Sequence, residues 1–330
     1  MLLENKKDGD MKIIVTGSEG SLMQATIPLL LAHGHRVIGV DNLSRYGVTN
    51  SVKTKEYEFH QLDITNKKDF VELSKGADVI IHAAAKVYGV LGLAHYCGDT
   101  LADEVTMCSN MLNACVENNI RRIVYLSSSM VYESCLQDVN FPLTEEMTDS
   151  TILPKTDYGL GKLVSERMCQ AFHRQHGIDY TIWRPFNIVS PYEQSMDEVG
   201  FSHVIPDFIE KIVFKKLNPV PIIGDGEQIR CFTWVGDVAR IIADYSMSDN
   251  TRNNIFNICN VQPISMKELA GMISYLSGKS SDNLKFDTTP GYKHDVKIRV
   301  PSINKLRRII GSYEFLETQE SVTRCLQTIT

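Results

Sequence analysis

Short apolar runs alternate with stretches of helical period through the first half of this 330-residue chain. Six runs are predicted to be strands: Lys12–Thr16, Arg36–Asp41, Tyr57–Leu62, Asp78–Ala83, Arg122–Ser127 and Asp179–Arg184. Between them, residues 21–33, 67–75, 99–118 and 157–176 carry apolar side chains at helical spacing. Strands that are apolar along nearly their whole length are typical of a parallel sheet covered by helices on both faces. The alternation therefore predicts an α/β fold built on a doubly wound parallel sheet.

The pattern changes after about residue 186, where the chain becomes irregular and richer in Pro and Gly. Helical spacing recurs near 203–215, 235–247 and 265–277. We expect residues 11–186 to form mainly a Rossmann-like domain and residues 187–330 mainly a smaller C-terminal lobe that binds substrate. A segment at about 228–260 is expected to return to the first domain.

Composition excludes several classes of function. The net charge is −6 without a basic tract, which argues against nucleic acid as a partner. No apolar run approaches the roughly 18 residues of a membrane span, and the N-terminus has no signal-peptide pattern. The eight cysteines form no CxxC pair and no Cys/His cluster, so we expect free thiols, no metal site and a cytoplasmic location.

A glycine-containing turn follows the first predicted strand. Gly17 and Gly20 allow a tight turn and a close approach of the backbone to a pyrophosphate, which the start of the next helix can bind. Glycines often only make turns, but this position between a strand and a helix favours dinucleotide binding. Met23 stands where a third glycine normally allows close helix–strand packing, so we expect a helix set further out or a weaker hold on the cofactor.

Asp41 closes the second predicted strand about 20 residues further on. A carboxylate there accepts hydrogen bonds from ribose hydroxyls and repels a 2′-phosphate, which favours NAD over NADP. Arg45 is the counter-argument, since it could serve a 2′-phosphate, although an exposed loop arginine is the simpler interpretation. Asp63 is either an adenine contact or the N-cap of the helix predicted at 65–74.

Tyr158 and Lys162 lie four residues apart and share one face of a predicted helix. A nearby ammonium lowers the pKa of a phenol, which is otherwise a poor base at neutral pH. The pattern Tyr-x-x-x-Lys arises by chance in many helices, and serines at a strand end more often cap a helix than catalyse. Here the serine run 127–129 ends the fifth strand, at the edge where doubly wound sheets bind ligands.

These residues closely resemble the extended short-chain dehydrogenase/reductase family, in particular its NAD-dependent nucleotide-sugar epimerases and dehydratases. The resemblance covers roughly residues 11–312 and includes Asp41–Ser44, His82–Ala85, Arg184–Asn187, Gly224–Gly226, Asp237–Val238 and Arg299–Pro301. It implies that Tyr158 is the acid/base, that Lys162 holds the ribose and depresses the phenol pKa, and that Ser128 binds the reacting oxygen. By the same resemblance, helices 99–118 and 157–176 of two subunits would pair in a homodimer.

The remaining site residues follow from the motifs and the resemblance together. The predicted cofactor-binding residues for NAD are Gly17, Gly20, Ser21, Leu22, Asp41, Asn42, Asp63, Ile64, Ala83, Ala84 and Lys162. The predicted substrate-binding residues are Asn187, Arg230, Arg299, Lys86 and His203. Two arginines suit a substrate pyrophosphate because they give charge-assisted contacts. Without the resemblance, both would be interpreted as solvated surface charges.

The residue before Val131–Tyr132 separates the reactions of the resembling enzymes. Dehydratases and sugar-acid decarboxylases carry a glutamate there, and the enzymes that epimerise GDP-sugars at C3 and C5 carry a cysteine, whereas this chain has Met130. We therefore favour an epimerase of a nucleotide-diphosphate sugar, at C4. The alternatives are a 3,5-epimerase and a C4 reductase or dehydrogenase of an NDP-sugar. Residues 84–87 and 202–206 resemble GDP-fucose synthase, which favours a GDP-linked sugar for the reductase.

Three departures from the family pattern leave room for a different function. Met23 replaces the third glycine, Glu104 stands near the place of an Asn, and Ser302 follows Arg-Val-Pro where an Asp is common. A protein that kept the fold and lost catalysis, as an NAD-binding regulator, is the remote alternative. Such a protein has little reason to retain Tyr158, Lys162 and Ser128 together.

Overall fold

A computed structural model describes residues 11–47, 57–135, 138–149, 153–193, 195, 201–279, 283–291 and 295–329. All the site residues predicted from the sequence lie within these ranges. No helix among them is long and apolar enough to cross a lipid bilayer.

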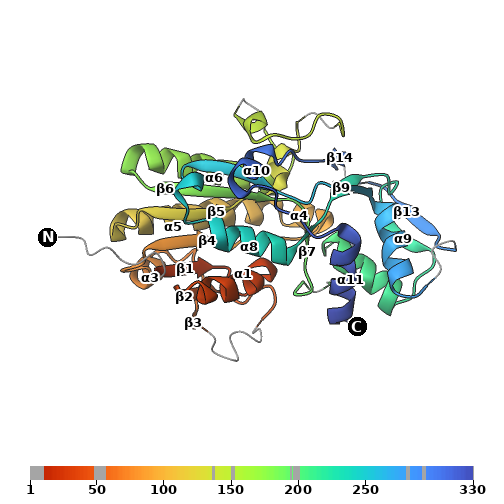
Figure 1. Cartoon of the computed structure of the whole chain (residues 1–330). Coiled ribbons are helices and arrows are strands. Elements are labelled where there is room, and N and C mark those ends of the chain that lie inside the picture. The colour runs from red at the N-terminus through yellow and green to blue at the C-terminus, as the bar shows by residue number, and fades with distance from the viewer. Residues whose placement is uncertain are drawn as a thin grey trace.

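Within the described residues, seven parallel strands form one sheet in the order β11-β6-β5-β4-β1-β2-β3 (Figure 1). Their bounds are β1 Lys12–Thr16, β2 Arg36–Asp41, β3 Glu58–Gln61, β4 Val79–His82, β5 Arg122–Leu126, β6 Asp179–Pro185 and β11 Asn254–Ile258. Since the chain leaves β1 in one direction and later crosses to β4 on its other side, the order reverses beside β1. Ligands bind at such a switch point in doubly wound sheets.

Helices cover both faces of this sheet. On one face, α1 (Ser21–Ala32) and α8 (Val235–Tyr245) pack side by side over an apolar cluster that includes Ile13 and Val15. On the other, α3 (Lys67–Leu73), α5 (Cys97–Asn118) and α6 (Asp157–His176) cover Ile14 and Ile80. Alternate residues of β1 thus enter opposite cores, because successive strand side chains point to opposite faces. The predicted doubly wound α/β fold is confirmed.

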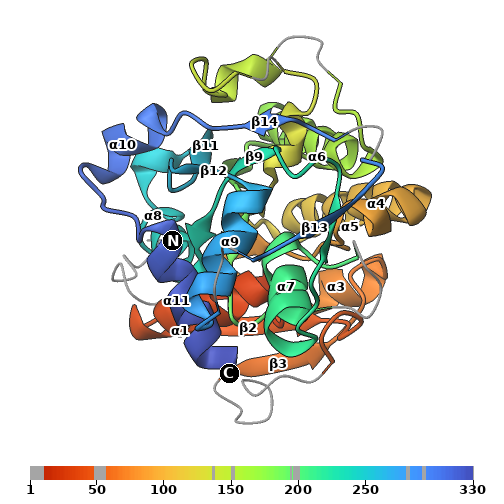
Figure 2. The same ribbon diagram turned by 90° about the vertical axis from the view of Figure 1, so that its right-hand side faces the viewer.

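The later chain builds a smaller lobe with its own apolar core, seen at the right of Figure 1 and facing the viewer in Figure 2. Its helices are α7 (Val204–Phe208), which continues as the π-helix η3 (Ile209–Phe214), α9 (Met266–Leu276) and α11 (Thr318–Ile329). Its strand pairs are β8 (Val220–Ile223) with β13 (Phe286–Thr289), and β9 (Ile229–Cys231) with both β12 (Pro263–Ser265) and β14 (Ile298–Arg299).

The remaining elements among the described residues are short. They are α4 (Val90–His95), β7 (Ile188–Val189) paired with β10 (Thr233–Trp234), α10 (Asn304–Ile310), and the 3-10 turns η1 (Ser129–Tyr132), η2 (Glu145–Thr148) and η4 (Asp249–Thr251). Three later segments belong to the main sheet: α8 covers it, β11 is its edge strand, and α10 packs against β11. Helix α10 lies outside the segment at about 228–260 that the sequence predicts to return to the first domain.

Predicted and observed elements differ mainly at their ends. Strands β3, β4 and β5 are shorter than predicted by one or two residues, and α5 begins at Cys97 rather than Asp99. β11 was not among the six predicted strands, because it begins with Asn254 and its apolar residues are interrupted by Asn257. Asn257 is nevertheless fully buried, where its amide donates to the carbonyls of Leu143 and Ser302.

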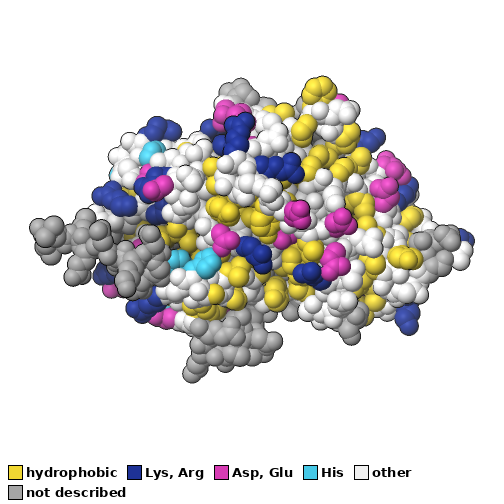
Figure 3. All heavy atoms as spheres, viewed as in Figure 1, with side chains coloured by type: hydrophobic (Ala, Val, Ile, Leu, Met, Phe, Trp, Pro, Cys, Tyr) yellow, Lys and Arg dark blue, Asp and Glu magenta, His cyan; other side chains and the backbone are white. Residues whose placement is uncertain are grey.

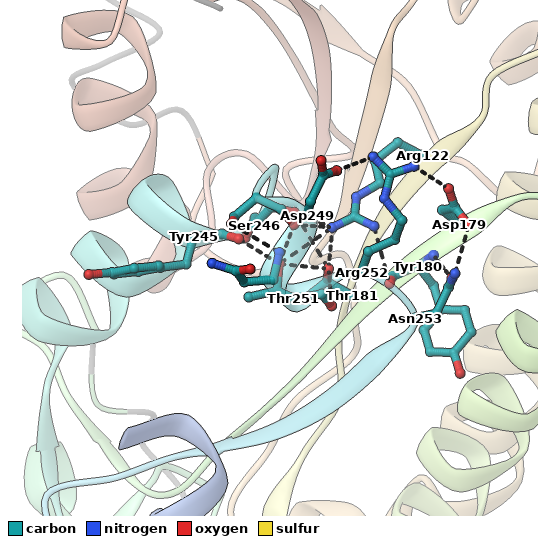
Figure 4. Close-up of polar contacts among 12 residues, drawn as sticks. Arg122, Asp179, Tyr180, Thr181, Tyr245, Ser246, Asp249, Thr251, Arg252 and Asn253 are labelled. Atoms are coloured by element: carbon teal, nitrogen blue, oxygen red, sulfur yellow. Dashed lines mark hydrogen bonds and ion pairs between the residues drawn. The ribbon is translucent and has the colours of Figure 1, made fainter. Parts of the chain in front are cut away.

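The amino edge of the sheet is closed by a polar cluster around Arg122, the first residue of β5 (Figure 4). Its guanidinium donates to Thr181 Oγ1 at 2.6 Å and to the carbonyl of Ser246 at 2.9 Å. Asp179 at the start of β6 accepts from Arg252 at 2.7 Å and from Asn253 at 2.8 Å. These contacts fasten the segment after α8 to the starts of β5 and β6.

Candidate active site

A cavity of about 560 Å³ lies at the carboxyl edge of the sheet, between the sheet and the smaller lobe. Every site residue predicted from the sequence lines it, from Gly17 directly after β1 to Arg299 on β14. The structure thus brings the predicted residues together at the switch point. The role of each remains a prediction.

The turn after β1 provides a cradle for a phosphate. Gly17 has a φ of 68° and its N–H donates to the carbonyl of Val40 at 2.8 Å. A Cβ at Gly17 would lie 2.7 Å from the backbone of Ala84, so only glycine fits between β1 and β4 here. Helix α1 starts at Ser21 without a side-chain cap, which leaves its first N–H groups open toward the cavity. This arrangement fits a dinucleotide pyrophosphate.

Met23 takes the place of the absent third glycine. It is 1% exposed and packs in the apolar cluster between α1 and the sheet. A flexible thioether side chain adapts to irregular gaps in a core. The helix–sheet contact is therefore filled rather than lost at this position.

Acidic side chains gather where β2 and β3 end. Asp41 accepts from the backbone N–H of Glu19 at 3.1 Å and of Leu43 at 2.7 Å. Burial raises the pKa of Asp41, and these two backbone hydrogen bonds oppose that shift. Asn42 donates to Asp63 at 3.1 Å, and Asp63 also accepts from the N–H of Thr65. The N-cap of α3 is Asn66, so Asp63 is not the helix cap that was its alternative interpretation.

Arg45 also lines the cavity, with its guanidinium carbon 4.8 Å from the ring centroid of Tyr46. It thus has a stacking partner within its own loop. This contact neither requires nor prevents a contact to a 2′-phosphate.

Tyr158 and Lys162 lie one turn apart on α6, whose start is fixed by Thr156. The hydroxyl of Thr156 accepts from the N–H of Gly159 at 3.1 Å, and Glu133 in turn accepts from both the N–H and the hydroxyl of Thr156. Ser128 caps η1 by accepting from the N–H of Met130 at 3.1 Å. The capping role considered for the serine run is therefore real, and Ser128 also lines the cavity beside Tyr158.

Opposing effects act on the phenol of Tyr158. Burial raises its pKa, the Lys162 ammonium lowers it, the Glu104 carboxylate raises it and a hydrogen bond with Ser128 lowers it. The net shift in the protein alone is upward. Lys162 therefore acts on Tyr158 in the direction that the sequence predicts, and burial outweighs it.

Two arginines face each other across neighbouring strands at the far end of the cavity. Arg230 on β9 and Arg299 on β14 are partners in the strand register and are 8% and 6% exposed. Arg230 donates to Asp295 at 2.9 Å, while Arg299 donates to Ser129 Oγ at 3.3 Å. Burial and the charge of Arg299 lower the pKa of Arg230 to about 9. Two like charges placed together in a buried site favour an anionic ligand.

The other predicted substrate contacts already have protein partners. Asn187 donates to the carbonyl of Cys231 at 2.9 Å, and Lys86 pairs with Asp103 at 2.5 Å. His203 Nδ1 pairs with Glu193 Oε1, and the histidine side chain is 47% exposed. Desolvation lowers the pKa of His203, and the charge and hydrogen bond of Glu193 outweigh it, so the pKa is raised.

Four acidic residues near the cavity were not identified from the sequence as site residues. Glu133 anchors Thr156, Glu193 pairs with His203, Asp295 pairs with Arg230, and Glu104 pairs with Lys162. Only Glu104 carried a signal, as a departure from the family pattern. The others come from segments without a motif, so their partners become visible only in three dimensions.

Known proteins resemble this chain over most of its length. Residues 13–259 match the model of the NAD dependent epimerase/dehydratase family. A putative UDP-glucose 4-epimerase of Methanocaldococcus jannaschii is 33% identical over 270 residues, which is 81% of this chain and 82% of that relative. GDP-L-colitose synthase of Yersinia pseudotuberculosis is 31% identical over 255 residues, 73% of this chain and 74% of the relative.

The fold has solved counterparts as well. The crystal structure of UDP-glucose 4-epimerase from Thermotoga maritima superposes with a TM-score of 0.82 at 22% identity and covers 96% of this chain and 98% of that one. Because the family model matches well over half of the chain, the assignment does not depend on this fold likeness. This chain belongs to the NAD-dependent epimerase/dehydratase family, whose cofactor is NAD.

Proposed function

We propose that this protein is an NAD-dependent epimerase that inverts C4 of the sugar in a nucleotide-diphosphate sugar. The observation that carries the proposal is the composition of one cavity. Tyr158, Lys162 and Ser128 lie in it together with the Gly17–Gly20 turn and the paired Arg230 and Arg299. The likeness to a putative UDP-glucose 4-epimerase supports the same reaction.

The cofactor would lie along the carboxyl edge of the sheet. The turn and helix start at Gly17, Gly20, Ser21 and Leu22 would hold its pyrophosphate. Asp41 and Asn42 would hold the adenosine ribose, Asp63 and Ile64 the adenine, and Ala83, Ala84 and Lys162 the nicotinamide half. NAD supplies reversible oxidation of an alcohol to a ketone. The carboxylate of Asp41 beside the buried Glu19 disfavours a 2′-phosphate.

Tyr158 acts as the acid/base. Its phenolate oxygen takes the proton of the sugar C4 hydroxyl and returns it after the resulting ketone has presented its other face. Ser128 donates a hydrogen bond to the reacting oxygen and holds it in place. Lys162 stabilises the phenolate by its charge, since its Nζ lies 5.8 Å from the centroid of the Tyr158 ring.

The side chain of Met130 favours an epimerase over the reactions that need a second proton transfer. It lines the cavity directly before Val131–Tyr132 and carries no titratable proton. Glu133 also lies near, but its carboxylate is engaged by Thr156 at 2.7 and 2.8 Å. With NAD as the oxidant and reductant, reaction at one carbon would require only Tyr158, Ser128 and Lys162 from the protein.

A second candidate is a reaction that needs a further general acid, either that of a C4 reductase of a GDP-sugar or that of a 3,5-epimerase. The pair Glu193–His203 favours a reaction of this kind. A histidine backed by a carboxylate is a competent general acid, and this one lies at the cavity. GDP-L-colitose synthase is among the relatives. Replacing His203 with Asn distinguishes the two reactions, because a reductase or 3,5-epimerase depends on the acid and a 4-epimerase does not.

We further propose a cytoplasmic homodimer that takes part in carbohydrate biosynthesis, with α5 and α6 pairing between subunits. Nucleic acid is not part of this proposal. On the face seen in Figure 3, acidic and basic side chains are interspersed, without a continuous basic tract among the described residues.

Conversion of UDP-glucose to UDP-galactose in the presence of NAD, followed by NMR, tests the main proposal. Tyr158→Phe should abolish turnover while NAD still binds, since only the proton-transfer group is removed. Mass spectrometry of small molecules released from the denatured protein identifies the nucleotide to test next. Retained turnover in Tyr158→Phe would refute the mechanism, and NAD binding without turnover of any nucleotide sugar would favour the inactive regulator.

A further inference from the structure

The ammonium of Lys162 lines the cavity and also has hydrogen-bond and ion-pair partners inside the protein. Its side chain is 3% exposed, and Nζ lies 3.1 Å from Oε2 of Glu104 on α5. Nζ also donates to the carbonyl of Leu126 at 3.0 Å. An ammonium has three N–H groups, so these two partners among the described residues leave one N–H for the cavity.

Glu104 is itself fixed in place. Its side chain is 2% exposed, and its second oxygen accepts from the hydroxyl of Tyr125 on β5 at 2.5 Å. Gly161 makes room for it, since a Cβ there would lie 3.3 Å from Cβ and Cγ of Glu104. The glycine before Lys162 thus lets α5 and α6 approach at the point where the ion pair forms.

We propose that Glu104 is a positioning residue. Its carboxylate lies on the side of Lys162 away from the cavity, balances the ammonium charge and leaves a single N–H of Lys162 for the cavity. The inference rests on the roles of Tyr158 and Lys162 under the proposed function. Glu104 does not line the cavity, so it acts through Lys162.

The titratable groups around Lys162 come from four elements. Besides Glu104 they are Cys108 on α5, Tyr125 on β5, Tyr158 on α6 and His82 on β4. Burial and the nearby Lys162 lower the pKa of His82 to about 3, so this histidine is neutral in the physiological range. Glu104 is therefore the acidic counter-charge of Lys162 in this set.

The carboxylate of Glu104 raises the pKa of both members of the Tyr158–Lys162 pair. For Lys162, burial lowers the pKa. The charge and hydrogen bond of Glu104, together with the charges of Tyr158 and Cys108, more than reverse this effect, so the pKa is raised and the ammonium stays protonated in the buried site. For Tyr158, the same carboxylate opposes the effect of Lys162. Since both shifts have one sign, removal of the carboxylate moves both macroscopic pKa values of the pair downward.

Glu104→Gln tests this with a side chain of the same shape and no charge. We expect its pH–rate profile to move toward lower pH by about one unit or more. The phenolate titration of Tyr158, measured by absorbance against a matched Tyr158→Phe protein without sugar substrate, should move the same way. Tyr125→Phe is the control, because it removes a hydrogen bond to the same carboxylate and keeps the charge. Profiles of Glu104→Gln that coincide with those of the unsubstituted protein would overturn the proposal.

A stability cycle covers the case in which Glu104→Gln folds poorly. A buried ammonium without its counter-charge is destabilising, so Glu104→Gln should lower the Tm, and the double variant Glu104→Gln/Lys162→Met should recover it. A double variant no more stable than Glu104→Gln would show that the carboxylate does not serve Lys162. The cycle needs no cofactor or substrate, so failure of the proposed reaction leaves its result unaffected.

Discussion

Arg184 on β6 and Arg299 on the cavity wall are both buried, but they differ in how their N–H groups are used. Arg184 donates to both carboxylate oxygens of Glu166, at 2.8 and 2.6 Å, and to the hydroxyls of Tyr132 and Thr148. Within the described part of the chain, Arg299 makes one hydrogen bond, of 3.3 Å, and its buried Nε has no partner. A saturated guanidinium is part of the scaffold, whereas an unsaturated one facing a cavity is available to a ligand.

Arg122, at the amino edge of the sheet, shows that a buried Nε without a partner does not by itself identify an arginine that binds a ligand (Figure 4). Its Nε also lacks a partner, while its terminal nitrogens donate to Thr181, Ser246 and neighbouring oxygens. Arg122 lines no part of the active-site cavity. The comparison therefore depends on two features together, an unmet hydrogen-bonding group and an adjacent cavity.

Arg184→Met should have the largest effect, on folding. Among the described residues, it leaves the buried Glu166 with only Ser127 as a hydrogen-bond donor, which we expect to cost about 3–5 kcal/mol of unfolding free energy. Urea unfolding measures the loss, and the double variant Arg184→Met/Glu166→Leu should regain most of it. A loss below about 1 kcal/mol would mean that the saturated network is not what holds this region.

Arg122→Met should also act on stability alone. It removes the donor for the Ser246 carbonyl and the Thr181 hydroxyl, for an expected loss of about 2–4 kcal/mol. Turnover measured well below the unfolding temperature should not change, because the cluster lies at the edge of the sheet away from the cavity. A variant with normal stability and impaired turnover would reverse the assignment of Arg122 to the scaffold.

The sequence predicted the main sheet and its helices better than it predicted the smaller lobe. Periodic apolar patterns located β1 to β6 and the five helices around them, since each buries one long apolar face. The smaller lobe uses strands of two to four residues, such as β9 and β14, which are too short to show a period. The family resemblance predicted Arg230 and Arg299 as substrate contacts, but their register as neighbours depends on β9 pairing with β14, which no local pattern encodes.

The acidic partners were missed for a related reason. Glu104 and Lys162 are 58 positions apart, and their contact follows from the crossing of α5 and α6. An ion pair is not a feature of either segment alone. Knowledge of the fold was therefore needed before Glu104 could be related to Lys162.

Arg299→Met should weaken binding and spare stability, the opposite of Arg122→Met. Loss of charge-assisted contacts to a diphosphate is expected to cost about 1.5–3 kcal/mol of binding free energy. Calorimetric titration with UDP and with GDP measures the Kd, and Arg122→Met is the matched control. Unchanged Kd values for both nucleotides would remove Arg299 from the substrate site.

The smallest effect is a proton that accompanies binding, and it follows from the pKa of Arg230. Burial and the charge of Arg299 lower that pKa to about 9. The pKa of Arg230 in the folded protein therefore lies below its value in the unfolded chain, and the unfolded chain holds more protons above pH 9. The unfavourable contribution of Arg230 to stability is full below pH 9 and fades above it.

A bound diphosphate restores the ordinary pKa of Arg230, so binding near pH 9 should take up about half a proton and binding at pH 7 almost none. Calorimetry in buffers of different ionisation enthalpy measures the uptake. Arg299→Met removes the like charge, so the pKa of Arg230 should rise and the proton uptake at pH 9 should shrink. A proton uptake that does not change in Arg299→Met would show that the charge of Arg299 does not act on Arg230.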